Sequence, residues 1–505
     1  HKNNNNKSNN NNKNDDKQEN KKKKKKTSKP RLSDLLTEAA LRIGATQLLF
    51  MDTPVYAAVS ETVESLRMHP KITVSKSQIS YVNAVLRTID REGREKLDSD
   101  TSIMDNVDPW LAQQWLDQYG KDTTTTIVEA AMSQSPIFIT INHRHRQEEV
   151  VSQSKEEDRE ERLEQIKDLF TTIDDETGDP IPAERLPIGS IRIPDNFGGT
   201  VSKWPLYEDG AWWVQDVSAT LPAIALFNTL SHQQKSVDTM HVVDLCAAPG
   251  GKTAQLCSFG FGRVDAIEYS EKRSRSLQQN LQRLHMQDIC NVVITDGRDF
   301  VPTSLSNGDD HDNGSASPPL FPPPPPTTTA VPVQGVLIDA PCSATGVGSR
   351  RPDVLRKDIQ LEELTKIQKE LCVQAVDNIL AVNGVLVYAT CSLLKQEGEE
   401  QIEELLSFYN NDNNSDNVKE EEEEHYSASA ASSVSSASSS SSVTLETIPF
   451  TPGELPGFDE CIDENGWLRV IPGVLPGSLH YCDGFFVARL RKKGREGVTQ
   501  RHQNK

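Results

Sequence analysis

The strongest constraint on the fold is an alternation of apolar strand-like segments with amphipathic helical segments, which begins at His241. Segments with strand character lie at residues 241–251, 263–270, 290–299, 335–348 and 384–392. Segments with the helical period lie between them, at residues 252–259, 272–286 and 361–380. This repetition predicts a doubly wound α/β domain, in which helices cover both faces of a mostly parallel sheet.

The sequence before this domain divides into three regions. Residues 1–30 are rich in Asn and Lys, have too few apolar residues for a core, and are predicted to be disordered. Residues 31–104 contain three segments with the helical period and predict a small all-α domain. Residues 105–235 mix helix and strand signals, which predict a linker followed by a small α+β region.

Low-complexity sequence interrupts the α/β domain, which we place at residues 236–495. Residues 304–332 include a run of prolines, and residues 410–442 are acidic and then rich in Ser. Neither segment can supply a core, so both are predicted to be surface insertions. Residues 496–505 form a basic tail.

Composition excludes several classes of function. The net charge is -20, but the charges occur in blocks, such as the lysines at 21–26, so the total says little about binding partners. The eight cysteines include no CxxC pair, and we expect neither a metal site nor a disulfide framework. No apolar run reaches the roughly 18 residues of a membrane span, so no membrane association is expected.

A turn with the sequence "CAAPGGK", at residues 246–252, follows the first strand of the α/β domain. Ligands of doubly wound sheets bind beyond the carboxyl ends of the strands, and adjacent glycines let the backbone approach a ligand closely. The turn does not match the dinucleotide fingerprint. Cys246 stands where a phosphate loop needs its first Gly, so the turn predicts a ligand that is not a polyphosphate.

Acidic residues end three successive strands, namely Asp244, Glu268 and Asp296. Carboxylates at these places suit the ribose hydroxyls and base edge of a nucleoside cofactor with little negative charge. S-adenosylmethionine is the simplest such cofactor. The alternative, that each acid caps the helix that follows it, explains any single acid equally well but the set less well.

Two cysteines are predicted to meet at the same edge of the sheet. Asp339 and Cys342 follow the fourth strand and Cys391 follows the fifth, and the ends of parallel strands can be neighbours. A thiolate that adds to carbon 6 of a pyrimidine turns carbon 5 into a nucleophile that accepts a methyl group. Asp339, if protonated or sharing a proton with the ring, would stabilise charge at ring nitrogen 3, and Cys342 would serve the release step.

Core packing is the alternative for any single cysteine, since a free Cys is commonly buried. We keep that interpretation for the five cysteines outside the turn and the two strand ends, which are Cys257, Cys290, Cys372, Cys461 and Cys482.

Three segments, "DLCAAPGGKT", "DAPCSATGVG" and "YATCSLLKQEGEE", resemble the signature blocks of the Sun/RsmB/NOL family of RNA cytosine-5 methyltransferases. The segments "LRIGATQLLFMDTPVYAAVSETVE" and "SYVNAVLR" are similar to the NusB-like domain of the Sun (RsmB) branch, which methylates small-subunit (16S) ribosomal RNA. The resemblance therefore implies a Rossmann-like methyltransferase domain preceded by a partial NusB-like domain and an RNA-binding α+β region.

The resemblance also assigns roles to residues. Cys391 is the implied nucleophile, which forms a covalent bond to carbon 6 of the cytosine, and Cys342 assists release. The residues implied to line the S-adenosylmethionine site are Cys246, Ala247, Ala248, Pro249, Gly250, Gly251, Lys252, Glu268, Asp296 and Asp339.

RNA is the expected partner of a chain that we expect to be a monomer. Lys203, Arg350, Arg351 and the basic segment "RLRKKGR" at 489–495 are candidate phosphate contacts, although surface Lys and Arg are commonly just solvated. Three tryptophans either stack on bases or pack in the core: Trp204, Trp212 and Trp213. The target cytosine must be single-stranded or flipped out, because a duplex hides its carbon 6 face.

Other functions stay open at this point. The same fold can serve a non-catalytic RNA-binding ribosome assembly factor, although such a scaffold needs neither thiol. A cytosine-5 methyltransferase of transfer RNA shares the chemistry, and one of DNA takes its nucleophile from a Pro-Cys motif. Insertions rich in Asn, Pro and Ser in a bacterial-type chain favour a plastid or mitochondrion over the cytoplasm.

Overall fold

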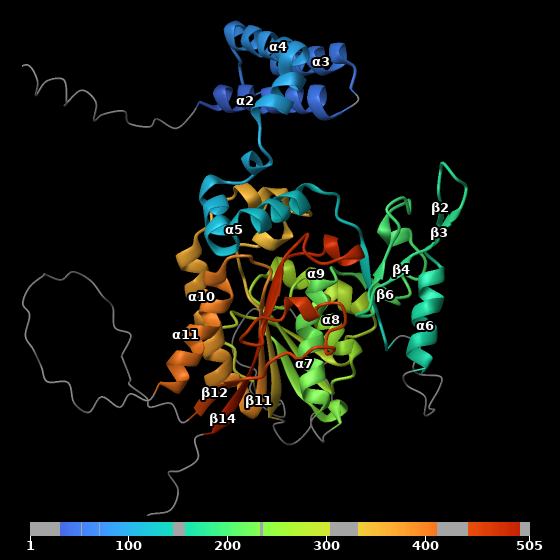
Figure 1. Ribbon diagram of the computed structural model, residues 1–505, viewed down its shortest axis with the longest axis vertical. Coiled ribbons are helices and arrows are strands. Elements are labelled where there is room, and N and C mark those ends of the chain that lie inside the picture. The colour runs from blue at the N-terminus through green and yellow to red at the C-terminus, as the bar shows by residue number, and fades with distance from the viewer. Residues whose placement is uncertain are drawn as a thin grey trace, which may run out of the picture. The chain divides into compact units, whose positions relative to one another are not determined.

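The computed structural model describes residues 31–51, 53–69, 71–144, 157–232, 236–302, 332–411 and 443–494. The chain divides into two compact units, His1–Ser102 and Ile103–Lys505 (Figure 1). The predicted disorder of residues 1–30, the predicted insertions and the basic tail lie wholly or almost wholly outside the described residues.

The first unit is built from three helices, α2 (Leu32–Phe50), α3 (Val55–Arg67) and α4 (Lys76–Asp100). A capping box of Ser75 and Gln78 starts α4. Leu86 of α4 is fully buried, and a Cβ added at Gly44 of α2 would lie 2.7 Å from its side chain. Glycine at this position therefore permits the close approach of α2 and α4.

The second unit begins with the short helix η1 (Ile103–Asn106) and the helix α5 (Pro109–Met132). Asp108 caps α5 by accepting the N–H of Trp110 at 2.9 Å. The amphipathic sequence "PWLAQQWLDQYG" at residues 109–120 predicts a short helix, and α5 extends beyond it because the helix continues after a kink at Gly120, where φ is 75°.

A small four-stranded sheet follows, with the strand order β4-β5-β1-β6. Its helix α6 and its aromatic core hold this region together, and the core includes Phe170, Trp204 and Trp212. The elements are β1 (Phe138–Ile141), α6 (Glu157–Asp168), β2 (Thr172–Ile173), β3 (Pro180–Ile181), β4 (Glu184–Arg185), β5 (Ile191–Arg192), η3 (Val201–Lys203) and β6 (Trp212–Val214).

The large sheet has the strand order β12-β14-β11-β10-β7-β8-β9, and β13 pairs with β14. The five strands from β11 to β9 are parallel, whereas β14 runs antiparallel to β11, β12 and β13. The strands are β7 (His241–Asp244), β8 (Arg263–Glu268), β9 (Cys290–Ile294), β10 (Val333–Asp339), β11 (Leu380–Thr390), β12 (Val443–Thr447), β13 (Leu468–Val470) and β14 (Phe485–Gly494).

Helices cover both faces of this sheet, with α7, α8 and α9 on one side and α10 and α11 on the other (Figure 1). Each face has its own buried cluster of apolar side chains, which confirms the predicted doubly wound fold. The helices are α7 (Leu221–Ser231), α8 (Gly251–Ser258), α9 (Glu271–Arg283), α10 (Leu361–Gln374) and α11 (Glu399–Asn410). Short helical turns are η4 (Ser218–Thr220), η5 (Val237–Thr239), η6 (Thr345–Val347), η7 (Pro352–Arg356), η8 (Ala375–Ile379), η9 (Lys395–Glu397), η10 (Asp459–Cys461) and η11 (Gly477–Tyr481).

The last residue of α11 is hydrogen-bonded to β12. The side-chain amide of Asn410 donates to the carbonyl of Leu445 at 2.8 Å and accepts its N–H at 2.9 Å. Val443 pairs with Gly494 at the end of β14, whereas Phe486 near the start of β14 pairs with Thr390. This contact therefore lies at the edge of the sheet opposite to the end of β11.

Candidate active site

The two cysteines predicted to meet do so at the ends of β10 and β11. These strands are parallel neighbours, and Asp339 lies opposite Ala389 in their register. The Sγ atoms of Cys342 and Cys391 are 3.5 Å apart, and both side chains are half-buried. The structure therefore places two accessible thiols side by side at the carboxyl edge of the sheet.

The two thiols differ in their surroundings. The hydrogen bond with Cys391, then burial, and then the charges of Glu397 and Asp339 raise the pKa of Cys342 well above its usual value. Cys342 therefore keeps its proton at neutral pH. The two sulfur atoms share one hydrogen bond, in which either thiol can be the donor.

Lys252, from the predicted cofactor turn, joins this pair. Its Nζ donates to the Oδ2 atom of Asp339 at 2.8 Å and lies 4.9 Å from the ring centroid of Phe485. Burial opposes the charged ammonium, but attraction to Asp339, Cys391 and Asp244 outweighs burial and raises the pKa of Lys252. The ammonium of Lys252 thus lies beside Asp339 and interacts electrostatically with Cys391.

The turn itself depends on glycine. Gly250 has a φ of 111°, and a Cβ at this residue would lie 2.7 Å from a methyl group of Leu277. Gly251 is the first residue of α8, so the free N–H groups of this helix face the edge of the sheet.

The three acidic strand ends lie along the same edge, but each has a local task as well. Glu268 accepts the N–H groups of Ala248 and Ser270, and Asp296 is paired with Arg298 at 2.7 Å. Asp244 accepts the hydroxyl of Thr253 through Oδ2, whereas its buried Oδ1 atom has no partner. Burial raises the pKa of Asp244 to about 6.

One part of the site was not predicted. The sequence predicts Glu397 and Glu399 in the first turns of a helix, where the helix dipole favours acids, and for Glu397 this is wrong. Glu397 ends η9, before α11 begins, and its carboxylate is fully buried. It accepts hydrogen bonds from Ser343 and Ser392, the residues that follow the two cysteines. Glu399 does lie in the first turn of α11 and pairs with Arg469.

Arg350, a predicted RNA contact, has its charge already engaged. It forms ion pairs with Asp216 and, at 3.3 Å, with Asp483, both of which are buried. Burial and the charge of Asp216 raise the pKa of Asp483 to about 8. The guanidinium therefore has two acidic partners inside the protein, and a phosphate contact at Arg350 stays a prediction.

The other predicted contacts differ among themselves. Lys203 is exposed, and Arg351 is exposed beside Asp353, with which it pairs at 2.9 Å. The three tryptophans proposed for stacking or packing are all buried, which favours packing. The five cysteines interpreted as core residues are buried as well.

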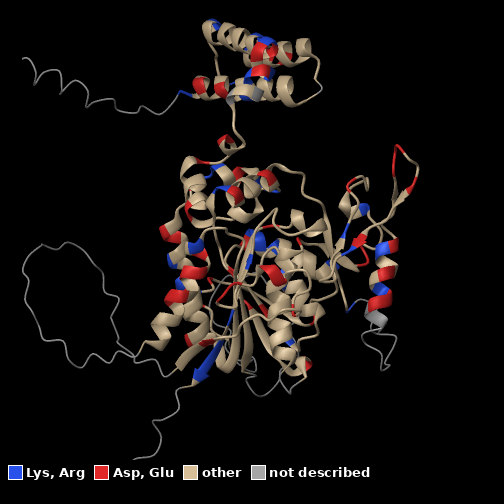
Figure 2. Ribbon diagram, viewed as in Figure 1, with Lys and Arg blue, Asp and Glu red and all other residues tan. Residues whose placement is uncertain are grey.

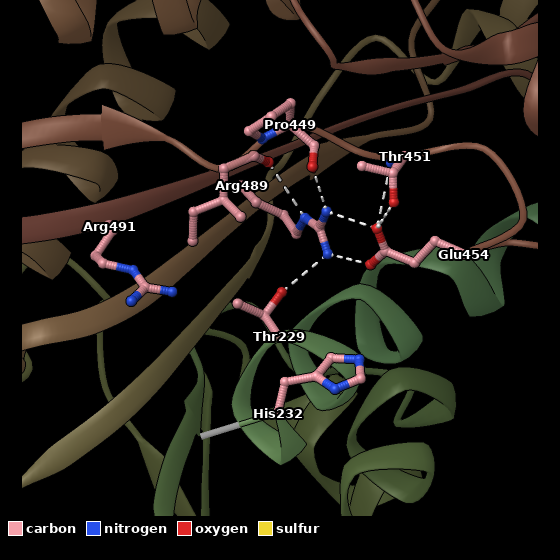
Figure 3. A pocket seen from close by; sticks show the side chains of 8 residues that line it. Thr229, His232, Pro449, Thr451, Glu454, Arg489 and Arg491 are labelled. Atoms are coloured by element: carbon pink, nitrogen blue, oxygen red, sulfur yellow. Dashed lines mark hydrogen bonds and ion pairs between the residues drawn. The ribbon is translucent and has the colours of Figure 1, made fainter. Parts of the chain in front are cut away.

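The basic segment at 489–495 is also partly structural. Figure 2 shows the end of β14 as basic. Arg489 lines a hollow of about 450 Å³, where it binds Glu454, Thr229 and the carbonyl of Pro449 (Figure 3). All of its donors are used within the protein, so Arg489 is not available for phosphate.

Comparison with known proteins now places this chain. The model of the family described as 16S rRNA methyltransferase RsmB/F matches residues 231–491. The chain belongs to this family. The NusB family model matches residues 7–91, a match that begins before residue 31, where we placed the start of the helical domain.

Bacterial members of the family cover most of the chain. Ribosomal RNA small subunit methyltransferase B of Vibrio vulnificus (strain YJ016) is 31% identical over 376 residues, which are 72% of this chain and 73% of that protein. The protein of the same name from Escherichia coli O157:H7 (strain EC4115 / EHEC) is 31% identical over 373 residues, 72% of each chain. The solved structure of PH0851 has a TM-score of 0.56 at 20% identity, covers 90% of this chain and 82% of its own, and confirms the fold.

The RsmB/F family uses S-adenosylmethionine, and the residues at the sheet edge fit this cofactor. The carboxylates of Asp244, Glu268 and Asp296 offer acceptors for hydroxyl and amino groups, and a carboxylate that already accepts two N–H groups has capacity left. The unpartnered Oδ1 of Asp244 is a buried acceptor that lacks a donor. Lys252 is the one basic residue of the turn, which suits a ligand without phosphate.

Neither a membrane span nor a metal cluster is found in the described part of the chain. Its helices are too short or too polar to cross a membrane. Its His, Cys, Asp and Glu side chains form no group of three or more that is arranged for a metal ion.

Proposed function

We propose that this protein methylates carbon 5 of a cytosine in small-subunit ribosomal RNA, with Cys391 as the nucleophile. The observation that carries the proposal is the 3.5 Å contact between the sulfur atoms of Cys391 and Cys342, beside the ion pair of Lys252 and Asp339. The names of the bacterial relatives support ribosomal RNA as the substrate.

The first step makes a bond between the Cys391 sulfur and carbon 6 of the base. The proton of the Cys391 thiol leaves to solvent as the sulfur–carbon bond forms, and the Cys342 sulfur lies 3.5 Å from the attacking sulfur. Asp339 shares a proton with ring nitrogen 3 and in this way stabilises the negative charge that develops there. S-adenosylmethionine, when bound, supplies the methyl group that carbon 5 receives.

The release step removes the carbon 5 proton and breaks the bond between sulfur and carbon 6. Once Cys391 is bonded to carbon, its thiolate charge no longer raises the pKa of Cys342. Cys342 can then lose its proton to solvent and take the proton from carbon 5. The electron pair re-forms the double bond of the ring as the Cys391 thiolate leaves.

Two surface cations complete the proposal as phosphate contacts. Lys203 and Arg351 are exposed, in contrast to Arg350, and each neutralised phosphate would make binding more sensitive to salt.

The test is methylation of defined RNA by the purified protein. Small-subunit ribosomal RNA, transfer RNA and DNA are each incubated with methyl-labelled S-adenosylmethionine, and the nucleosides are identified by mass spectrometry. We expect 5-methylcytosine in ribosomal RNA only. Label in transfer RNA alone would show that transfer RNA, not ribosomal RNA, is the substrate. Label on an atom other than carbon 5 of cytosine would overturn the proposed reaction. No transfer to any of the three would support the alternative of a non-catalytic assembly factor.

A further inference from the structure

The carboxylate of Glu397 links the loops that carry the two cysteines. Its Oε1 atom accepts the N–H of Ser343 at 2.9 Å and the side-chain amide of Gln368 at 3.0 Å. Its Oε2 atom accepts the hydroxyls of Ser343 and Ser392, the latter at 2.6 Å. The side chain is fully buried, so no water competes for these bonds.

The two loops meet this carboxylate in the same way. Each cysteine is followed by a serine, and both serine hydroxyls bind one oxygen atom of Glu397. The hydroxyls also contact each other at 3.0 Å. The Oε2 atom of Glu397 therefore binds the residue next to Cys342 in one loop and the residue next to Cys391 in the other.

The backbone of Glu397 and the backbone of its partner Ser392 are each fixed by a further hydrogen bond. Its carbonyl accepts the hydroxyl of Tyr388, in β11, at 2.8 Å. Arg469, which is paired with Glu399, donates to the carbonyl of Ser392 at 2.6 Å. A carboxylate held in this way fixes the positions of both loops relative to β11.

Burial of the Glu397 carboxylate lowers the stability of the folded protein unless other interactions offset the lost hydration. In the described residues Glu397 forms no ion pair, and its partners are neutral donors. Burying a charge costs several kcal/mol, which hydrogen bonds to a charged acceptor offset because they are shorter and stronger than neutral ones. Apolar packing at this site would not hold the two serines to a common point.

We infer that Glu397 is a positioning residue, which sets the separation of the Cys342 and Cys391 sulfur atoms. Its effect on methyl transfer rests on the proposed function, whereas its effect on the thiols does not. Among the described residues, the carboxylate of Glu397 has no hydrogen bond to the cofactor turn or to either sulfur atom, so it holds the thiols through the two loops, while its charge also raises the pKa of Cys342.

The first experiment measures the separation of the thiols without RNA or cofactor. Phenylarsine oxide bonds to two nearby thiols with loss of one water, and peptide mass spectrometry locates the bridge. We expect a bridge between Cys342 and Cys391 in the wild type. In Glu397→Gln, which keeps the shape but not the charge, bridging slows by about tenfold because two reacting groups depend steeply on their alignment. The control is Glu403→Ala, an exposed acid of α11, which should bridge at the wild-type rate.

The second experiment separates positioning from general stability. Thermal unfolding selects variants that fold, and kcat and KM are measured on them. We expect Glu397→Gln to lower kcat by about tenfold, up to about a hundredfold if the thiols move by 1 Å, with the KM for S-adenosylmethionine unchanged. Ser343→Ala, which removes a single hydroxyl, is the second variant if Glu397→Gln does not fold, and it should slow bridging to a smaller extent.

The outcomes distinguish this inference from the proposed function. The role of Glu397 would be overturned if folded Glu397→Gln showed the bridging rate and the kcat of the wild type. If Glu397→Gln does not fold, the same result in Ser343→Ala would overturn it. Slower bridging in that variant, together with a wild type that methylates no cytosine, would support the positioning role and overturn the proposed function.

Discussion

Two pairs of cysteines in this protein share one chemistry and differ in place. Cys257 of α8 and Cys290 of β9 lie in the core, 0% and 9% exposed, whereas Cys342 and Cys391 follow the ends of β10 and β11 and are half-buried. In both pairs a thiol–thiol hydrogen bond is the first cause of a raised pKa, for Cys290 as for Cys342. A neighbouring thiol therefore does not make a reactive pair; the edge of the sheet and the nearby ammonium of Lys252 distinguish the second pair.

The largest effect is expected when one cysteine of each pair is replaced by alanine and the two variants are compared. Cys391→Ala should lower methyl transfer by more than about a thousandfold, because loss of a nucleophile is among the most severe active-site changes. Cys257→Ala should keep the activity per folded molecule and lower the free energy of unfolding by about 1–3 kcal/mol. Label transfer to RNA and chemical denaturation measure the two effects, and equal activity losses would contradict the distinction.

Loss of the second sulfur should give a different result in each pair. Cys342→Ala leaves the nucleophile in place but removes the group that assists release, so a covalent complex of protein and RNA should accumulate. Denaturing electrophoresis with labelled RNA detects this complex, and Cys290→Ala is the matched control without it. Accumulation in Cys391→Ala instead would reverse the assigned roles.

A carboxylate that acts on both regions gives the next effect. Asp244 raises the pKa of Cys290 and of Lys252, and its own pKa in the folded protein is about 6. The folded state thus favours the protonated acid, so its contribution to stability is complete below about pH 4 and is lost as the pH rises through 6. The loss amounts to about 3 kcal/mol if each pKa unit is worth 1.36 kcal/mol.

Asp244→Asn should therefore reduce the fall of the unfolding midpoint between pH 4 and pH 7. Asn keeps an acceptor for Thr253, and Glu403→Ala serves as an exposed control. Denaturation curves across this pH range measure the change, and parallel curves for wild type and Asp244→Asn would contradict the assignment.

The smallest expected effect is a difference in the rate at which the cysteines of the two pairs are alkylated. Iodoacetamide applied to the folded protein should modify Cys391 at least about tenfold faster than Cys257 or Cys290, since alkylation needs an accessible thiolate. Cys342 should react after Cys391, because its raised pKa keeps it protonated. Peptide mass spectrometry over a time course measures the order, and prior modification of Cys257 would contradict it.

Local patterns were sufficient to predict the parallel part of the sheet and the meeting of the two cysteines. Strand and helix periods locate β10 and β11, and parallel strands necessarily end at one edge. The antiparallel β14 was not predicted as such, because its apolar segment has no signal for its direction. The end of α5 was missed because Gly120 resembles a helix terminator although the helix continues after it.

The interior partners of charged residues could not be predicted from the sequence. Arg350 resembles any surface arginine until Asp216 and Asp483, far away in sequence, are seen beside it. Glu397 precedes a helix, where acids are common for electrostatic reasons, and this local explanation concealed its burial. A signal was nevertheless present, since Ser follows Cys at both strand ends and two hydroxyls need an acceptor.

The amide pair between Asn410 and Leu445 has a consequence for how this chain can evolve. It joins two residues that are 35 positions apart in the sequence, and the entropy of closing a chain grows only with the logarithm of its length, by about 0.6 kcal/mol per doubling. Residues can be gained or lost between these anchors at little thermodynamic cost. Asn410 and Leu445 lie at the far edge of the sheet from the two thiols. Changes in the number of residues between them can therefore be selected independently of changes at the thiols.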